Sequence, residues 1–141
     1  MVKAIIKMKN ILFLLLFVSA TSVFSQRNSD SLVITDESRE IARKKIESIR
    51  EDIINHKIDF ASAAIKYSQD PGSASNGGLY QNISKGTFVS EFEGVAFSVE
   101  INKVSEVFQT DFGYHILVVI ARKGDVIDVR HILIQAKGEK K

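Results

Sequence analysis

Two histidines near the end of the chain stand in almost the same local sequence. His115 lies in the run Tyr-His-Ile-Leu and His131 in the run Arg-His-Ile-Leu, with Lys123-Gly124-Asp125 between the two runs. Both runs are apolar and β-prone, so the pattern predicts a hairpin that carries one imidazole on each strand. Together with the carboxylate of Asp70, these imidazoles could in principle bind a metal ion. The three residues lack the compact ligand spacing of metal motifs, however, and a metal site is the least favoured interpretation.

The relative position of the two histidines depends on the length of the hairpin loop. A three-residue loop over residues 122–124, with Gly124 left-handed, pairs Ala121 with Asp125 and therefore His115 with His131. Directly opposed residues share one face of a sheet, with Cβ atoms about 5 Å apart. This register is the predicted one. The alternative, a two-residue loop at Lys123-Gly124, offsets the histidines by one residue and spoils the pairing.

Asp70 lies in a segment that is rich in turn-forming residues. Residues 68–78 read Ser-Gln-Asp-Pro-Gly-Ser-Ala-Ser-Asn-Gly-Gly and contain the single proline of the chain and three of its eight glycines. A loop of this composition beside a compact core is often functional. A plain connector is the alternative interpretation.

The elements that must position these residues can be read from hydrophobic periodicity. Apolar residues at helical spacing predict an amphipathic helix over residues 37–57 capped by Asp36, and Asp59 is expected to cap a shorter helix over residues 60–68. A third short helix is expected over residues 90–97. Strands are expected over residues 31–35, 79–83, 104–109 and 114–121, with a turn at residues 110–113. This order indicates an α+β domain with a largely antiparallel sheet.

The N-terminal residues have the composition of an export signal. Three lysines precede a short apolar run and then small residues, so residues 1–25 are expected to be a secretory signal peptide; the run is too short to span a membrane.

The remaining 116 residues carry 16 basic and 17 acidic side chains, a formal charge of −1, which gives no indication of nucleic acid as a partner. With no cysteine in the chain, the domain must be stable without disulfides.

Several motifs resemble the parvulin-type peptidyl-prolyl cis/trans isomerases. They are Tyr67-Ser68-Gln69-Asp70-Pro71-Gly72-Ser73-Ala74, Asn76-Gly77-Gly78, Phe92-Glu93 and Phe112-Gly113-Tyr114-His115. The resemblance runs from about residue 31 to residue 120. It implies the parvulin-like variant of the FKBP-like superfold, a four-stranded antiparallel sheet surrounded by helices. The isomerase domain is expected over residues 26–123, followed at residues 124–141 by a C-terminal strand, which completes or extends the sheet, and a basic tail.

The resemblance also implies a chemistry and a set of site residues. Parvulins rotate the peptide bond before proline, which breaks no covalent bond and so needs no cofactor or metal; the rotational barrier is about 18–20 kcal/mol. The implied catalytic residues are His115, Asp70 and His131. The implied substrate-binding residues are Phe88, Phe92, Thr110 and Phe112. Ordinary core packing is the alternative role for the two pocket phenylalanines, and a structural role in the sheet is the alternative for His115.

The sequence departs from the family pattern in two places. Leu79-Tyr80-Gln81-Asn82 replaces the usual Asp-Leu-Gly and aromatic residue, and Ser31 stands where the first strand of the family carries its other histidine. The missing Arg-His-Ile-Leu-Ile pattern occurs instead at residues 130–134. Three arrangements follow: a relocated strand in which His131 completes the site, the start of a further parvulin domain, or a strand-exchanged dimer. The first is favoured.

The leading hypothesis is an exported prolyl isomerase, periplasmic or secreted, which acts on proline-containing unfolded polypeptides and assists their folding. Unaided proline isomerisation takes tens of seconds or longer, so such a catalyst is useful. The alternative is a binding module with the same fold that holds unfolded chains without catalysis. No integral membrane segment is expected after cleavage of the signal.

Overall fold

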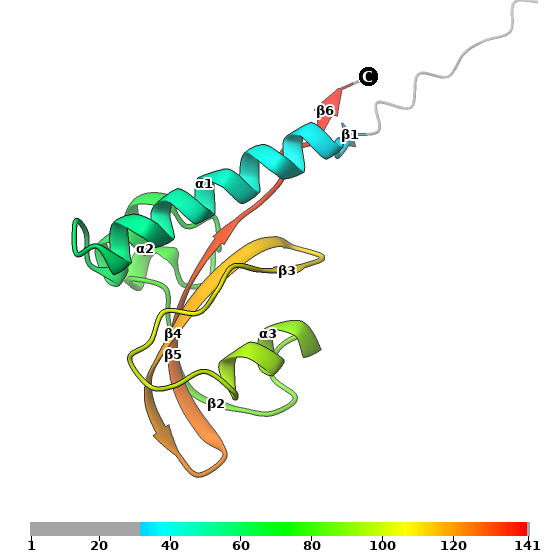
Figure 1. Cartoon of the computed structure of the whole chain (residues 1–141). Coiled ribbons are helices and arrows are strands. Elements are labelled where there is room, and N and C mark those ends of the chain that lie inside the picture. Colours follow the sequence, from blue (N-terminus) through cyan, green and yellow to red (C-terminus); the bar gives the residue numbers. More distant parts are fainter. Residues whose placement is uncertain (1–31, 141) are drawn as a thin grey trace, which may run out of the picture.

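The computed structural model describes residues 32–140 (Figure 1). The expected signal peptide, residues 1–25, lies outside this described part. The described elements, in chain order, are β1 Leu32–Val33, α1 Asp36–Ile54, α2 Phe60–Tyr67, a 3-10 turn at Ala74–Asn76, β2 Leu79–Ser84, α3 Ser90–Ala96, β3 Phe108–Thr110, β4 Gly113–Lys123, β5 Val126–Ile134 and β6 Glu139–Lys140. None of the helices in residues 32–140 is long and apolar enough to cross a membrane.

Four of the strands form one antiparallel sheet in the order β2-β5-β4-β3. The expected fold class is therefore confirmed: an α+β domain with a four-stranded antiparallel sheet. Strand β3 is shorter than expected, because Val104 makes only an isolated bridge to Val118 and regular pairing begins at Phe108. The expected turn at residues 110–113 is present, since Thr110 pairs with Gly113.

Helix α1 begins and ends close to the expected residues, with a different N-cap. The side-chain oxygen of Thr35, not that of Asp36, accepts a hydrogen bond from the amide of Ser38 at 3.1 Å. Asp36 instead occupies the first turn, where a negative charge complements the helix dipole. Helix α2 has the expected cap, because Asp59 accepts from the amide of Ser62 at 3.0 Å.

The helices cover opposite faces of the sheet (Figure 1). Helices α1 and α2 pack on one face, where the core includes Ile46, Ile116 and Ile132. Helix α3 packs on the other face, where the core includes Phe92 and Leu117. Because side chains alternate along a strand, the residues of β4 and β5 divide between these two cores, and both histidines lie on the α3 face.

Strand β5 lies in the middle of the sheet, between β2 and β4 of the same chain. It carries five buried apolar side chains, which are Ile127, Val129, Ile132, Leu133 and Ile134. Strand β1, by contrast, pairs only with β6 in a separate two-stranded sheet at the end of α1 (Figure 1). The structure thus corresponds to the relocated-strand arrangement, in which the strand that carries His131 occupies an interior position.

The predicted hairpin register is wrong, although the predicted face is right. Lys123 pairs with Val126 around a two-residue turn at Gly124-Asp125, and Gly124 is left-handed with φ of 59°. Further along, Leu117 pairs with His131 and His115 with Leu133, so the pairing is shifted by two residues from the predicted one. The histidines are therefore diagonal neighbours instead of directly opposed ones.

A β-bulge at Ile120 keeps the two histidines on the same face. Near the turn Ala121 pairs with Asp128, whereas Val119 pairs with Val129, so Ile120 has no partner in the ladder. Without the bulge, Ile120 would pair with Val129, the register set by the turn would continue along the hairpin, and His131 would oppose Val118. His131 would then point to the α1 face, because a slip of one residue moves a side chain to the other face of the sheet.

Candidate active site

The two histidine rings stack on each other at the centre of the α3 face. Their centroids are 5.8 Å apart with an interplanar angle of 15°, and the ring of Phe108 stacks on the outer side of His115 at 5.2 Å. Phe92, from α3, presents its ring edge-on to both imidazoles at 6.1 and 5.3 Å. Both histidines are buried, and this packing holds each ring in one orientation.

The loop after α2 is attached to β5, and this attachment brings Asp70 to His131. The amide of Gln69 donates to the carbonyl of Leu133 at 2.8 Å, and the amide of Leu133 donates to the Ser68 hydroxyl at 3.2 Å. On the far side of the loop, the amide of His131 donates to the carbonyl of Gly78 at 2.9 Å. The turn-rich segment thus continues the sheet pairing along β5, and Asp70 lies in its first turn.

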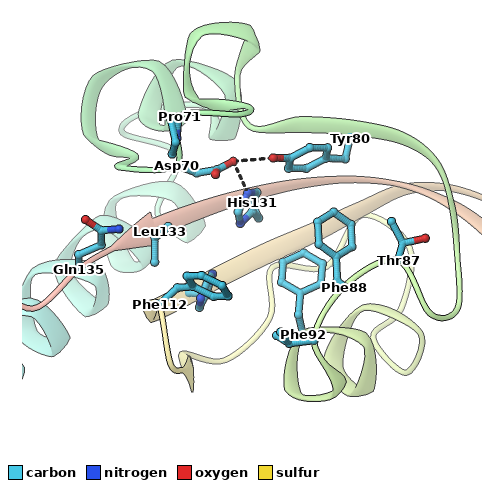
Figure 2. A pocket seen from close by; sticks show the side chains of 12 residues that line it. Asp70, Pro71, Tyr80, Thr87, Phe88, Phe92, Phe112, His131, Leu133 and Gln135 are labelled. Atoms are coloured by element: carbon cyan, nitrogen blue, oxygen red, sulfur yellow. Dashed lines mark hydrogen bonds and ion pairs between the residues drawn. The ribbon is translucent and has the colours of Figure 1, made fainter.

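One oxygen of the Asp70 carboxylate is the meeting point of three side chains, and Figure 2 shows two of them, His131 and Tyr80. Oδ2 accepts from Nε2 of His131 at 2.9 Å, from the Tyr80 hydroxyl at 3.0 Å and from the Ser73 hydroxyl. Burial acts to raise the pKa of Asp70, but the hydrogen bonds from Ser73, His131 and Tyr80 outweigh it and lower the pKa below its ordinary value. Asp70 is therefore an ionised, acceptor-only group at neutral pH.

His115 is held by the β3–β4 turn. Its Nε2 lies 2.8 Å from the Thr110 hydroxyl oxygen, which also accepts a hydrogen bond from the amide of Phe112 at 3.1 Å. Thr110 is itself buried. Because the turn and the histidine share this hydroxyl, the turn that presents Phe112 is directly attached to the stacked rings.

Both imidazoles are neutral at pH 7, with the proton on Nε2. Nδ1 of each ring is buried and has no hydrogen-bond partner among the described residues. A buried N–H without a partner is rare and costly, so the bare nitrogen belongs at Nδ1. Burial lowers the pKa of His115 to about 4, and the neighbouring His131 acts in the same direction. Burial also lowers the pKa of His131, although its hydrogen bond to Asp70 opposes this effect.

An apolar cavity of about 570 Å³ opens in front of the histidines. Its aromatic wall is continuous, with ring centroids 5.1 Å apart between Tyr80 and Phe88 and 4.7 Å apart between Phe88 and Phe92. Phe112 lines the cavity from the β3–β4 turn and is 60% exposed. Figure 2 shows these side chains converging from separate elements, and the lining residues are Asp70, Pro71, Tyr80, Thr87, Phe88, Val89, Phe92, Phe112, His115, His131, Leu133 and Gln135.

Six of the seven residues expected at the site line this one cavity: His115, Asp70, His131, Phe88, Phe92 and Phe112. The seventh, Thr110, does not line it and instead holds His115. Phe92 belongs to the core as well as to the cavity wall, and its role in substrate binding stays a prediction.

Sequence reasoning missed Tyr80, Ser73 and Phe108. Ser73 is fully buried and donates to Asp70, and its position three residues after an aspartate in a turn was a usable signal. Tyr80 lies in the segment that departs from the family pattern. The departure indicates that the usual family residues are missing there, but not that Tyr80 forms a hydrogen bond to Asp70. Phe108 was expected as a strand residue, and nothing in its local sequence indicates that it stacks on a histidine.

An antiparallel α+β domain with two stacked neutral histidines over an apolar cavity is the architecture of a rotamase domain. The family model for the rotamases, described as the PPIC-type PPIase domain, matches residues 24–121. The chain therefore belongs to the PPIC-type, or parvulin-type, PPIase family, as its motifs predicted. The matched region ends before β5, the strand that supplies His131.

Individual relatives carry names of folding factors. The chain is 36% identical over 103 residues to a protein named foldase protein PrsA from Halalkalibacterium halodurans, covering 71% of this chain and 30% of that protein. It is 44% identical over 82 residues to a protein named chaperone SurA from Dechloromonas aromatica, covering 58% of this chain and 18% of that protein. The chain thus spans less than a third of the length of these curated relatives.

A solved structure is also similar to this chain. It is the crystal structure of a peptidylprolyl isomerase, PrsA, from Bacillus cereus, which is 33% identical with a TM-score of 0.49. The similarity covers 70% of this chain and 32% of that one.

Proposed function

We propose that this protein is a peptidyl-prolyl cis/trans isomerase that acts on Xaa-Pro bonds of unfolded or extended polypeptides. The observation that carries this proposal is the cavity of about 570 Å³, in which an aromatic wall faces two neutral stacked histidines and one fixed carboxylate. A proline ring fits the apolar wall formed by Phe88 and Phe92. The adjoining amide then lies against His115, His131 and Asp70.

The proposed mechanism lowers the rotational barrier without a covalent intermediate. A planar amide resists rotation because its C–N bond is partly double, and it loses that resonance when twisted. An apolar cavity favours the twisted form, which has less charge separation, by replacing water around the amide. Asp70 Oδ2 already accepts three hydrogen bonds, so this oxygen is poorly placed to act as a nucleophile and better placed to orient His131.

The proposed setting is outside the cytoplasm, periplasmic or secreted, where the enzyme assists the folding of exported chains. Support comes from the expected signal peptide and from relatives whose names are foldase and chaperone. No site residue in the cavity carries a free positive charge, and the mature chain is nearly neutral, which is consistent with polypeptide as the partner.

A proline-peptide isomerisation assay tests the proposal. We expect the mature chain to accelerate cis/trans exchange and the refolding of a protein whose folding is limited by proline isomerisation. The variant Phe88→Ala should raise KM for the peptide, because it removes the ring between Tyr80 and Phe92 in the aromatic wall. Phe97→Ala is the matched control, since Phe97 is another partly buried phenylalanine of the same core that does not line the cavity.

The assay also separates the catalytic proposal from a binding module. A wild-type protein that does not exceed the uncatalysed rate, yet prevents aggregation of an unfolded client, would overturn the enzyme proposal and favour the binding module.

A further inference from the structure

Tyr80 makes contacts that no other residue of β2 makes. Its hydroxyl donates to Asp70 Oδ2 at 3.0 Å, and its ring lies 5.5 Å from the His131 ring and 5.1 Å from the Phe88 ring, centroid to centroid. It therefore joins the polar and the apolar halves of the site (Figure 2). Tyr80 stands in the segment of residues 79–82 that departs from the parvulin pattern.

Gly72 provides the space that the Tyr80 hydroxyl occupies. A Cβ atom added to Gly72 would lie 2.3 Å from that hydroxyl oxygen, closer than real Cβ contacts allow. The next atoms are farther away, with Tyr80 Cζ at 3.4 Å and Asp70 Oδ1 at 3.8 Å. Gly72 does not have a left-handed backbone, so the glycine is needed there for space and not for conformation.

We propose that Tyr80 is a positioning residue of this site: its hydroxyl, admitted by Gly72, holds the Asp70 carboxylate against Nε2 of His131. This inference rests on the proposed isomerase function for its effect on rate. The groups that face Asp70 are His131 from β5, Tyr80 from β2 and Ser73 from its own loop, with His115 behind His131.

The Tyr80 hydroxyl has a role beyond packing, because it donates its hydrogen bond to Asp70 Oδ2. The Tyr80 hydroxyl and His131 Nε2 reach the same oxygen, so a carboxylate that loses Tyr80 keeps only Ser73 beside His131 on that oxygen and is held less firmly in the orientation that faces His131. A carboxylate that accepts fewer hydrogen bonds also has a higher pKa. Both changes weaken the partner that keeps the His131 proton on Nε2.

The first test removes only the hydroxyl. In Tyr80→Phe we expect kcat/KM for a proline peptide to fall about tenfold, as for the loss of one hydrogen bond to a charged group. We also expect the acid limb of the pH–rate profile to move to higher pH, because Asp70 becomes easier to protonate. Tyr114→Phe is the matched control, since the Tyr114 ring packs against the core on the other face of the sheet.

A second readout does not depend on activity. Carbon-detected NMR of the Asp70 carboxyl group should give a higher titration midpoint in Tyr80→Phe than in wild type, and the His131 Nε2 proton should exchange faster with water. An unchanged Asp70 midpoint together with an unchanged His131 signal would overturn the proposal. If wild type does not catalyse isomerisation but Tyr80→Phe still shows these NMR changes relative to wild type, the proposed function would be overturned and the positioning role would be supported.

The third test uses the fit between Gly72 and Tyr80. Gly72→Ala should displace the hydroxyl from Asp70 and reduce kcat/KM to the level of Tyr80→Phe. In the double variant, Gly72→Ala should cause no further loss, because the clashing oxygen is gone. Gly94→Ala is the control, since an added Cβ there meets nothing within 4 Å. Additive losses in the double variant would show that the two residues act independently and would contradict the proposal.

Discussion

Removal of β5 should abolish the folded domain, even though the family match ends before this strand. A chain that stops after Lys123 loses a strand that pairs on both sides, with β2 and with β4. It also loses five buried apolar side chains, each 4% exposed or less. Burial of one such side chain contributes about 1.5–3 kcal/mol, so their removal costs about 8–15 kcal/mol. This loss is comparable to the whole stability of a typical domain, about 5–15 kcal/mol.

The assay for this prediction is thermal unfolding followed by circular dichroism, with amide NMR spectra of the same samples. We expect the chain truncated after Lys123 to show no cooperative transition and poorly dispersed spectra. A chain truncated after Lys137 is the control, because it loses only β6, which pairs with β1 outside the main sheet. This control should unfold cooperatively, with only a small decrease in Tm.

Complementation gives the same prediction a second form. A synthetic peptide of residues 125–136, added to the chain truncated after Lys123, should restore the dispersed spectrum, because the edges of β2 and β4 remain available for pairing. The reasoning would be refuted by a truncated chain that unfolds cooperatively at the Tm of the full chain. That result would mean that residues 26–123 form the domain without β5.

Two further predictions concern the buried polar groups. Acidification from pH 7 to pH 4.5 should lower the free energy of unfolding: the pKa of His115 is about 4 in the folded state, against 6.5 ordinarily, so the unfolded chain takes up a proton that the folded chain excludes, with a slope approaching about 1.4 kcal/mol per pH unit. Urea unfolding at both pH values measures this, and a His115→Asn variant that is as sensitive to pH as wild type would contradict it. Thr110→Val should cost about 1–3 kcal/mol in urea unfolding at pH 7, because the amide of Phe112 and Nε2 of His115 lose their shared partner. A variant as stable as wild type would show that the turn does not depend on this hydroxyl.

Much of the fold could be predicted because local rules and tertiary packing agree. The helical spacing of Ala42, Ile46, Ile49 and Ile53 predicted one buried stripe, and these four residues are buried in α1. The apolar runs around His115 and His131 predicted a hairpin, and β4 and β5 form it. In each case the same residues that favour the local structure also provide the buried face, so no other part of the chain had to be known.

The hairpin register shows where this reasoning stops. The predicted pairing was wrong because the turn has two residues, Gly124-Asp125, instead of the predicted three at residues 122–124, and because the bulge at Ile120 then shifts the ladder by one residue. A bulge depends on how the whole strand twists and packs against its neighbours, and a count of residues from the turn does not contain it. The two histidines do share one face of the sheet, as predicted, but the register that places them there differs from the predicted one.

The sequence by itself determined the family, the α+β class and six of the twelve residues that line the cavity, because these follow from motifs and from apolar periodicity. Only the tertiary structure decided that β5 lies inside the sheet and that Tyr80, ten residues from Asp70, donates to it. The physical reason is that strand order and side-chain hydrogen bonds are set by competition among long-range contacts. A strand with two apolar faces can pair in several places, and the core that it completes selects one of them.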